Sequence, residues 1–149
     1  QSKTIAVNRR ARFEYSIEED FEAGLVLVGT EVKTLRQGSG VNITDAYAGE
    51  KDGELWLLNS QINVYSHGNR NNHEPRRPRK LLLHKKQMKK YLGRIRLKGN
   101  TLIPLTLYFN SRGLVKIKIG LATGKKQHEK RESIKARDWE REKQRLMKH

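Results

Sequence analysis

The apolar residues of this chain occur in short runs separated by turn residues, and this arrangement restricts the fold more than any other feature. Gly24–Val32 and Gly53–Asn59 are rich in Val or Leu, as strands typically are. Thr101–Phe109 and Leu114–Ile119 flank the turn-forming segment Asn110–Gly113, which predicts a β-hairpin. The chain is therefore expected to build its core from short antiparallel strands.

A second hairpin is predicted upstream, where Glu50–Gly53 separates Ala46–Gly49 from Leu55–Leu58. In the later hairpin, the second arm alternates. Its apolar residues, Val115, Ile117 and Ile119, face one side, and Lys116 and Lys118 face the other. Such a strand has one buried face and one basic face.

Two helices are also predicted. Glu31–Arg36 leads to a stop at Gly38 and overlaps the end of the preceding strand, whereas Leu82–Leu97 places apolar residues close to helical spacing. Short strands, hairpins and one interpolated helix indicate a mainly β fold, a small and partly open antiparallel barrel of the oligonucleotide-binding type. A chain of 149 residues suits one such domain.

The overall charge indicates the class of partner. The chain has 32 Lys and Arg against 16 Asp and Glu, for a formal net charge of +16. Positive charges at this density repel one another, so they are tolerated best where the partner is a polyanion. Nucleic acid is the first candidate, and an anionic membrane surface is the second.

The sequence also bears on location. No apolar stretch approaches the roughly 18 residues of a membrane-spanning helix, and Gln1–Arg12 contains no apolar signal core. The absence of cysteine excludes disulfides and thiolate metal sites and fits a reducing compartment. We expect a cytoplasmic protein.

The positive charge is concentrated between Arg70 and Lys98, where twelve Lys or Arg residues accompany a single acid, Glu74. Ordinary surfaces mix both signs, so this asymmetry favours a surface that faces polyphosphate. Within it, Asn69–Arg79 is rich in Pro and Arg and has little prospect of packing. We predict that this part of the chain faces RNA through four basic residues, Arg76, Arg77, Arg79 and Lys80.

Aromatic residues offer a second means of contact with RNA. Tyr15, Tyr47, Tyr65 and Tyr108 can stack on unpaired bases, but tyrosines in a small barrel also serve as core or rim packing. The residues alone leave both interpretations open.

The C-terminal segment 124–149 is almost entirely charged, with opposite charges three residues apart and no apolar stripe wide enough to bury. We expect a tail that is mobile alone and helical on a partner. On a helix, Arg137, Arg141, Arg145 and Lys148 align as a basic stripe that suits a phosphate backbone, although a freely solvated helix fits the same pattern.

Catalysis finds no support in the sequence. The acidic cluster Glu18, Glu19, Asp20 and Glu22 has no second cluster converging on it, so we interpret it as a solvated helix start or turn rather than a magnesium site. The histidines lack zinc-ligand spacing. Gly120–Lys126 is a near miss to a phosphate-binding loop, since it has one residue too few and a Lys where Ser or Thr is needed. We therefore expect no metal and no cofactor.

Several short motifs of the sequence resemble those of the small protein B family, the tmRNA-binding (SsrA-binding) proteins of bacterial trans-translation. The resemblance runs from about Ile5 to Met147. The motifs on which the resemblance rests occur in the same order as in the family: Gly29–Arg36, Asp52–Trp56, Glu74–His84, Leu105–Phe109 and Gly124–Arg131.

The resemblance implies a non-enzymatic adaptor in the bacterial cytoplasm. Such a protein binds the tRNA-like domain of tmRNA and accompanies alanyl-tmRNA, and through it elongation factor Tu, into stalled ribosomes. The barrel, residues 1–123, would take the place of a missing anticodon arm. The tail, residues 124–149, would fill the empty mRNA channel of the small subunit.

The resemblance also implies site residues. Positions that match the tmRNA-facing surface are Tyr15, Glu22, Leu82, His84 and Lys116, with Lys118 beside them. Glu22 would accept hydrogen bonds from ribose or base amino groups, and Lys116 would neutralise phosphate. Leu82 has two open roles, packing against RNA or in the core.

The tail positions match the region that meets the small-subunit rRNA at the decoding centre. They are Gly124, Lys125, Lys126, His128, Lys130 and Arg131, followed by Arg137, Trp139, Arg141 and Arg145. His128 would stack on an rRNA base there. Two other functions remain as alternatives, a general ribosomal or rRNA-assembly protein and, more distantly, a structured-RNA nuclease.

Overall fold

The computed structural model describes residues 2–66, 72–124 and Arg141. Strands predominate, and all of their pairings are antiparallel. The strands are β1 (Lys3–Val7), β2 (Tyr15–Leu25), β3 (Val41–Asn42), β4 (Tyr47–Lys51), β5 (Glu54–Leu58), β6 (Gln61–Ile62), β7 (Arg79–Leu82), β8 (Asn100–Phe109) and β9 (Val115–Gly124). The helices in these ranges are α1 (Ala11–Glu14), α2 (Gly29–Arg36) and α3 (Lys85–Ile95).

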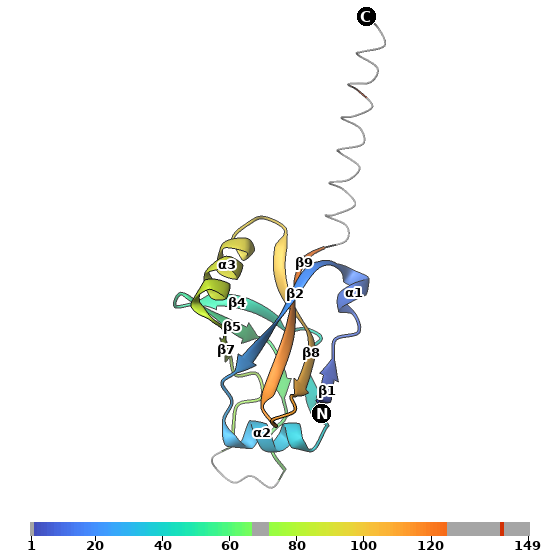
Figure 1. Cartoon of the computed structure of the whole chain (residues 1–149). Coiled ribbons are helices and arrows are strands. Elements are labelled where there is room, and N and C mark those ends of the chain that lie inside the picture. The colour runs from blue at the N-terminus through green and yellow to red at the C-terminus, as the bar shows by residue number, and fades with distance from the viewer. Residues whose placement is uncertain (1, 67–71, 125–140, 142–149) are drawn as a thin grey trace, which may run out of the picture.

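The main sheet has seven strands in the order β1-β8-β4-β5-β7-β2-β9, and a further pairing joins β8 to β9. That pairing closes a ring through β8, β4, β5, β7, β2 and β9, while β1 adds to the free part of the β8 edge. The weakest seam lies between β4 and β8, where Ala48 and Leu102 form the single paired position. The expected mainly β barrel is confirmed (Figure 1). The β8–β9 pairing closes its ring of strand pairings, whereas a partly open barrel was expected.

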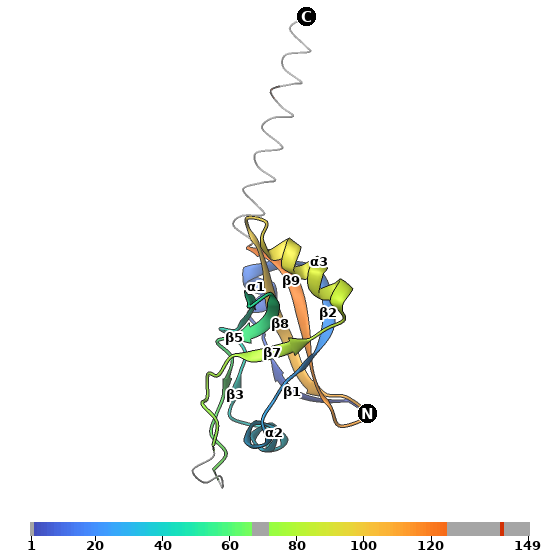
Figure 2. The same ribbon diagram turned by 90° about the vertical axis from the view of Figure 1, so that its left-hand side faces the viewer.

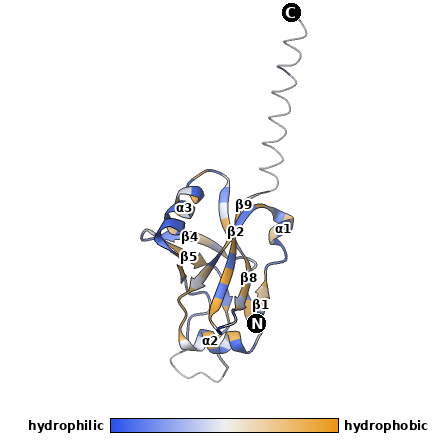
Figure 3. Cartoon of the chain, viewed as in Figure 1, coloured by the Kyte–Doolittle hydropathy of each residue, from blue (hydrophilic) through white to orange (hydrophobic). Residues whose placement is uncertain are grey.

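The barrel interior is filled by side chains from alternate positions of the strands. In β9, Ile117 and Ile119 are fully buried while Lys118 is exposed, as the alternation predicts. Figure 3 shows polar and apolar positions mixed along the strands, which is the pattern of a sheet with one solvent-exposed face.

The two longer helices cover different parts of the barrel. In Figures 1 and 2, α2 lies below the strands and α3 lies at the other end. Leu35 of α2 is buried, and Tyr91 of α3 stacks on Phe21 of β2 with ring centroids 3.8 Å apart. α3 therefore covers the core with Tyr91 and Leu92, whereas α2 buries Leu35 together with the polar residues Glu31 and Thr34.

Both predicted hairpins are confirmed. The turn between β4 and β5 places Asp52 and Gly53 at φ values of 53° and 77°, and the turn between β8 and β9 places Gly113 at 78°. These are left-handed conformations that glycine adopts without a steric penalty and that aspartate tolerates better than most residues.

Three segment predictions are wrong. Gly24–Val32 is not one strand, because β2 ends at Leu25 and α2 begins at Gly29. The acidic cluster lies inside β2 rather than in a helix start or turn, since β9 pairs along nearly its whole length. The helix predicted from Leu82 begins at Lys85, because Leu82 pairs with Gly24 as the last residue of β7.

Candidate RNA interface

Four of the predicted RNA-facing residues lie around one hollow on the barrel surface. Glu22 from β2, Leu82 from β7, His84 before α3 and Lys116 from β9 line a cavity of about 510 Å³. The sequence distance from Glu22 to Lys116 is large, so only the closed arrangement of β7, β2 and β9 brings these side chains together. The hollow offers a carboxylate, an amine, an imidazole and an apolar surface within one site.

Strand register explains why these residues converge. Gly24 pairs with Leu82 on one side of β2 and with Lys116 on the other. A side chain at Gly24 would meet Leu82, since an added Cβ atom would lie 3.2 Å from the Leu82 Cβ atom. The absence of a side chain at this point keeps the hollow open between its walls.

Leu82 belongs to the surface rather than the core, because 51% of it is exposed. A neighbouring hollow of about 320 Å³ shares Gly24, Leu82 and Lys116 and is lined otherwise by apolar residues, among them Leu27 and Leu114. An apolar shelf therefore adjoins the polar hollow, and such a shelf can pack against a ribose or base face.

Glu22 is held by a partner that the sequence did not identify. The Tyr108 hydroxyl of β8 donates a short hydrogen bond to Oε2 of Glu22. Burial and this bond to a carboxylate raise the pKa of Tyr108 to about 12. Tyr108 is thus a neutral donor that fixes one carboxylate oxygen of Glu22 and leaves the other oxygen for a ligand.

The two lysines of β9 point outward beside this carboxylate. Lys118 pairs with Glu22 across β2 and β9, and Lys116 pairs with Gly24. Neither lysine has an ion pair with any residue that the structure describes. Both amines are therefore available to phosphate.

The first turns of α3 extend the basic surface beyond His84. The exposed residues Lys85, Lys86 and Lys89 have no ion-pair partner among the described residues. Further along the chain the cations are neutralised, since Lys90 binds Glu19 at 3.2 Å and Arg94 binds Glu18 at 3.0 Å. The free positive charge therefore lies at the start of α3, next to the hollow.

Tyr15 lies apart from this hollow. It starts β2, seven residues before Glu22, and an extended strand covers that interval in about 23 Å. Tyr15 lines a separate hollow with Tyr47, Asp45 and Glu14. The structure therefore does not bring Tyr15 together with the other predicted residues.

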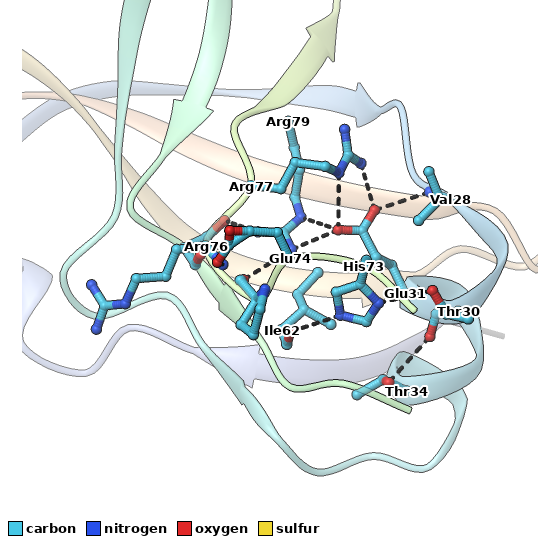
Figure 4. Close-up of polar contacts among 12 residues, drawn as sticks. Val28, Thr30, Glu31, Thr34, Ile62, His73, Glu74, Arg76, Arg77 and Arg79 are labelled. Atoms are coloured by element: carbon cyan, nitrogen blue, oxygen red, sulfur yellow. Dashed lines mark hydrogen bonds and ion pairs between the residues drawn. The ribbon is translucent and has the colours of Figure 1, made fainter. Parts of the chain in front are cut away.

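The arginines of the predicted basic loop meet at a buried carboxylate instead of facing outward. Glu31 of α2 is fully buried and binds Nη2 of Arg77 at 2.5 Å and Nη2 of Arg79 at 2.6 Å. Its Oε1 atom also accepts from the Val28 N–H at 2.9 Å, which caps the first turn of α2. Figure 4 shows these groups converging on Glu31 while Arg76 extends away.

The contacts from Arg77, Arg79 and Val28 favour the ionised form of Glu31. Burial alone would raise the pKa of its carboxyl, but hydrogen bonds from Arg77 and Val28 and the charge of Arg79 together hold that pKa below its ordinary value. Burial lowers the pKa of the Arg79 guanidinium, an effect that Glu31 opposes. The pair remains charged at neutral pH because arginine does not lose its proton in proteins.

The prediction that Arg79 faces RNA is wrong, since none of its side chain is exposed. Its remaining donors bind Ser60 Oγ at 2.9 Å and the Pro75 carbonyl at 3.1 Å. Arg77 has 29% of its side chain exposed, and Lys80 binds Glu54 at 2.6 Å. Arg76 is exposed and donates to Asn59 and Gln61, so it is the most accessible of the four.

The described part of the loop is packed, contrary to expectation. His73 is buried, with Nε2 2.8 Å from the Ile62 carbonyl and Nδ1 2.9 Å from Thr30 Oγ1. Because a carbonyl only accepts, the Nε2 atom carries the proton in its contact with Ile62. The sequence offered no signal for this, since a lone histidine in a polar stretch has no spacing to interpret.

Most of the predicted tail residues lie outside the described residues. They are Lys125, Lys126, His128, Lys130, Arg131, Arg137, Trp139 and Arg145. Gly124 ends β9 and pairs with Tyr15, and Arg141 is exposed. The phosphate-loop near miss is an extended strand over Gly120–Gly124.

Membrane spans and metal clusters are both absent from the described part of the chain. Within it, no helix is long and apolar enough to cross a membrane. No group of three or more His, Asp or Glu residues in these ranges is placed to hold a metal ion.

Comparison with known proteins identifies the family. The profile of the SmpB protein family matches residues 5–149, which is nearly the whole chain. The chain belongs to the SmpB protein family. The expected resemblance to small protein B is therefore confirmed.

Individual SmpB relatives agree with this assignment. The SsrA-binding protein of Novosphingobium aromaticivorans is 57% identical over 148 residues, covering 99% of this chain and 92% of that protein. That of Caulobacter vibrioides is 56% identical over 147 residues, covering 99% of this chain and 96% of that protein. The name of these relatives describes proteins that bind SsrA.

A solved SmpB structure shares the fold. A chain described under "tmRNA-SmpB: a journey to the center of the bacterial ribosome" superposes with a TM-score of 0.67 at 51% identity. The match covers 80% of this chain and 82% of that one. The barrel is therefore the SmpB fold.

Proposed function

We propose that this SmpB-family chain is a non-enzymatic adaptor that binds the tRNA-like domain of tmRNA and delivers it to stalled ribosomes for trans-translation. Family membership supports the partner, since the matched relatives are named SsrA-binding proteins and the description of the matched structure names tmRNA-SmpB and the bacterial ribosome. The single observation that carries the proposal at the site is the convergence of Glu22, Leu82, His84 and Lys116 on one hollow.

The chemistry of the hollow suits folded RNA. Lys116 and Lys118 supply charge for the backbone, and Leu82 offers an apolar surface for a sugar or base. Glu22, with one oxygen already bound by Tyr108, has acceptor capacity for a ribose hydroxyl or a base amino group. A phosphodiester has no hydrogen-bond donor. A carboxylate beside the lysines would therefore select positions of the RNA that present a ribose hydroxyl or a base amino group.

The division of labour along the chain is also a proposal. Residues 1–123 would bind tmRNA, and residues 124–149 would enter the mRNA channel and meet the decoding centre. Elongation factor Tu would be reached indirectly, through alanyl-tmRNA. We propose a cytoplasmic location on the same grounds, since translation takes place there.

A binding comparison tests the proposal. The full chain is titrated with the tRNA-like domain of tmRNA, with an ordinary tRNA and with single-stranded DNA at several salt concentrations. We expect preference for the tRNA-like domain to persist as salt weakens the non-specific complexes. Equal affinity for all three would reject the adaptor and favour a general RNA-binding role.

The hollow itself is tested by charge removal within it. Lys116→Gln should weaken binding of the tRNA-like domain, whereas Lys51→Gln should not, since Lys51 lies in the β4–β5 hairpin beside Trp56. If both variants bind alike, this hollow is not the tmRNA site.

A further inference from the structure

Tyr108 and Glu22 meet across the outer face of β9, although neither residue belongs to that strand. Tyr108 of β8 pairs with Lys116 of β9, and Glu22 of β2 pairs with Lys118 on the other side. Directly paired residues share a face of the sheet, and so do residues two apart in one strand. All four side chains therefore lie on the same face, and the bond from Tyr108 to Glu22 crosses β9 between the two lysines.

Tyr108 acts on the carboxylate from outside the site. The tmRNA hollow is the cavity lined by Glu22, Leu82, His84 and Lys116, and its walls do not include Tyr108. The phenol of Tyr108 is half-buried and neutral, because burial and the bond to a carboxylate raise its pKa to about 12. At physiological pH its hydroxyl is therefore a permanent donor to Glu22.

This bond leaves Glu22 with one oxygen for a ligand. Oε2 accepts from Tyr108, and Oε1 has no hydrogen bond from any residue within 2–66 and 72–124. A carboxylate with two free oxygens binds two donors side by side, which is how it would hold guanine through its ring N–H and its amino group. Because Oε2 is occupied, Glu22 suits a ligand group that offers a single donor.

The flanking lysines indicate where that donor lies in an RNA strand. Lys116 and Lys118 both belong to β9 and are separated by roughly 7 Å along the strand. Neither has an ion pair with a described residue, so both amines can bind phosphate. The ribose joins consecutive phosphates and carries the 2′-hydroxyl, whereas the bases project away from the backbone. A carboxylate beside two phosphate-binding amines therefore faces a ribose hydroxyl.

We propose that Tyr108 is a specificity-determining positioning residue, which restricts Glu22 to one free oxygen so that the tmRNA hollow selects a ribose 2′-hydroxyl. The paired donors of a guanine edge are disfavoured there, and a deoxyribose strand offers no donor at that point. This inference rests on the proposed function, because it takes the tRNA-like domain as the ligand of the hollow.

Nucleotide-analogue interference tests the choice of donor. The full chain is mixed with tRNA-like domains that carry 2′-deoxynucleotides sparsely and at random, and the bound molecules are compared with the free ones. For the wild type we expect 2′-deoxy substitution at the contacted ribose to weaken binding about tenfold, as loss of a hydrogen bond to a charged group does. Glu22→Ala and Tyr108→Phe should both reduce this interference. Interference from inosine in place of guanosine, with none from 2′-deoxynucleotides, would identify a base amino group and overturn the proposal.

A double-mutant cycle tests whether Tyr108 acts through Glu22. Tyr108→Phe should weaken binding of the tRNA-like domain about fivefold in the wild type and cause no further loss in Glu22→Ala. Tyr91→Phe, which removes a hydroxyl from a ring stacked on Phe21 in the core, is the matched control and should change neither affinity nor interference. Additive losses would mean that Tyr108 contacts RNA independently, and a loss of affinity with unchanged interference would mean a structural role; either result overturns the proposal.

The outcomes separate this proposal from the adaptor function. If the wild type prefers the tRNA-like domain to an ordinary tRNA but shows no 2′-deoxy interference that depends on Glu22, the adaptor function stands and the ribose contact is rejected. If the wild type shows no such preference, the adaptor function is rejected, while interference measured on the bound RNA still decides the ribose contact.

Discussion

At the residue scale, the most informative contact is the hydrogen bond between Tyr108 and Glu22. The sequence alone indicates only a stacking or packing role for this tyrosine, but in the structure it holds the carboxylate of the proposed site. In the proposed site, Tyr108 would be a positioning residue, since it holds Glu22 rather than contacting RNA itself.

The raised pKa of Tyr108 predicts a distinct alkaline titration. Its phenol ionises at about 12 rather than near 10, because burial and the bond to Glu22 favour the neutral form. The stabilisation is therefore fully present below pH 10 and is lost as pH rises toward 12. Phenolate absorbance should show a late step that Tyr108→Phe removes and that Glu22→Gln shifts to lower pH. Superimposable titrations of wild type and Tyr108→Phe would contradict this.

A second prediction concerns Glu31. Replacing it with alanine leaves Arg79 buried without its carboxylate, which should lower the free energy of unfolding by about 3–5 kcal/mol. Glu54→Ala, which removes the half-exposed partner of Lys80, should cost less than about 1 kcal/mol. Urea unfolding with unchanged m-values measures both. Similar losses of stability in the two variants would show that the Glu31 cluster contributes no more than a surface ion pair.

The same residue predicts an acid limb of stability. Because the pKa of Glu31 is held below its ordinary value of 4.5, its contribution is present above that pH and is lost as pH falls further. Glu31→Gln should flatten the stability profile below pH 5 relative to wild type. An unchanged acid profile would contradict the lowered pKa.

At the element scale, α3 is divided into a free basic start and a neutralised later part. Tyr91 and Leu92 attach it to the core, and Lys90 and Arg94 bind β2 acids. Only its first turns, next to His84, carry unpaired cations. The charge asymmetry in the sequence therefore overstates the surface available to RNA.

This division predicts different salt dependences. Replacing Lys85, Lys86 and Lys89 together with Gln should reduce the slope of log affinity against log salt for the tRNA-like domain, by up to about one for each phosphate that is no longer neutralised. The matched triple substitution of Lys90, Arg94 and Arg96 should change the slope less, since each of these is already paired with an acid. Equal slopes in the two variants would reject the division.

At the scale of the whole molecule, the ring of strands forms the core and positions the residues around the tmRNA hollow, and the chain leaves the ring at Gly124. Gly124 still pairs with Tyr15, so the strand ends one residue beyond the boundary expected at 123. A truncation that preserves the barrel should therefore remove residues 125–149.

We expect this truncation to leave the melting temperature and the affinity for the tRNA-like domain nearly unchanged, because the ring of strands and the hollow lie within residues 2–124. Peptide tagging in a reconstituted translation system should be abolished. Persistent tagging would contradict the role of the tail, and a weakened affinity for tmRNA would contradict the division between barrel and tail.

The sequence by itself determined what depends on neighbouring residues. The alternation of Val115–Ile119 set the buried and basic faces of β9, and the turn residues set both hairpins, because period and turn chemistry are local. The ordered family motifs carried the identity of the family, and through it the residues of the hollow.

Only the tertiary structure decided what depends on partners distant in sequence. Leu82 continues a strand instead of starting a helix because Gly24 pairs with it. Arg79 is buried because Glu31, 48 residues away, supplies its counter-charge. Tyr108 and Glu22, 86 residues apart, meet only because β2 and β8 both flank β9. Composition shows how much charge a chain carries, but the closure of the barrel determines which charges remain free.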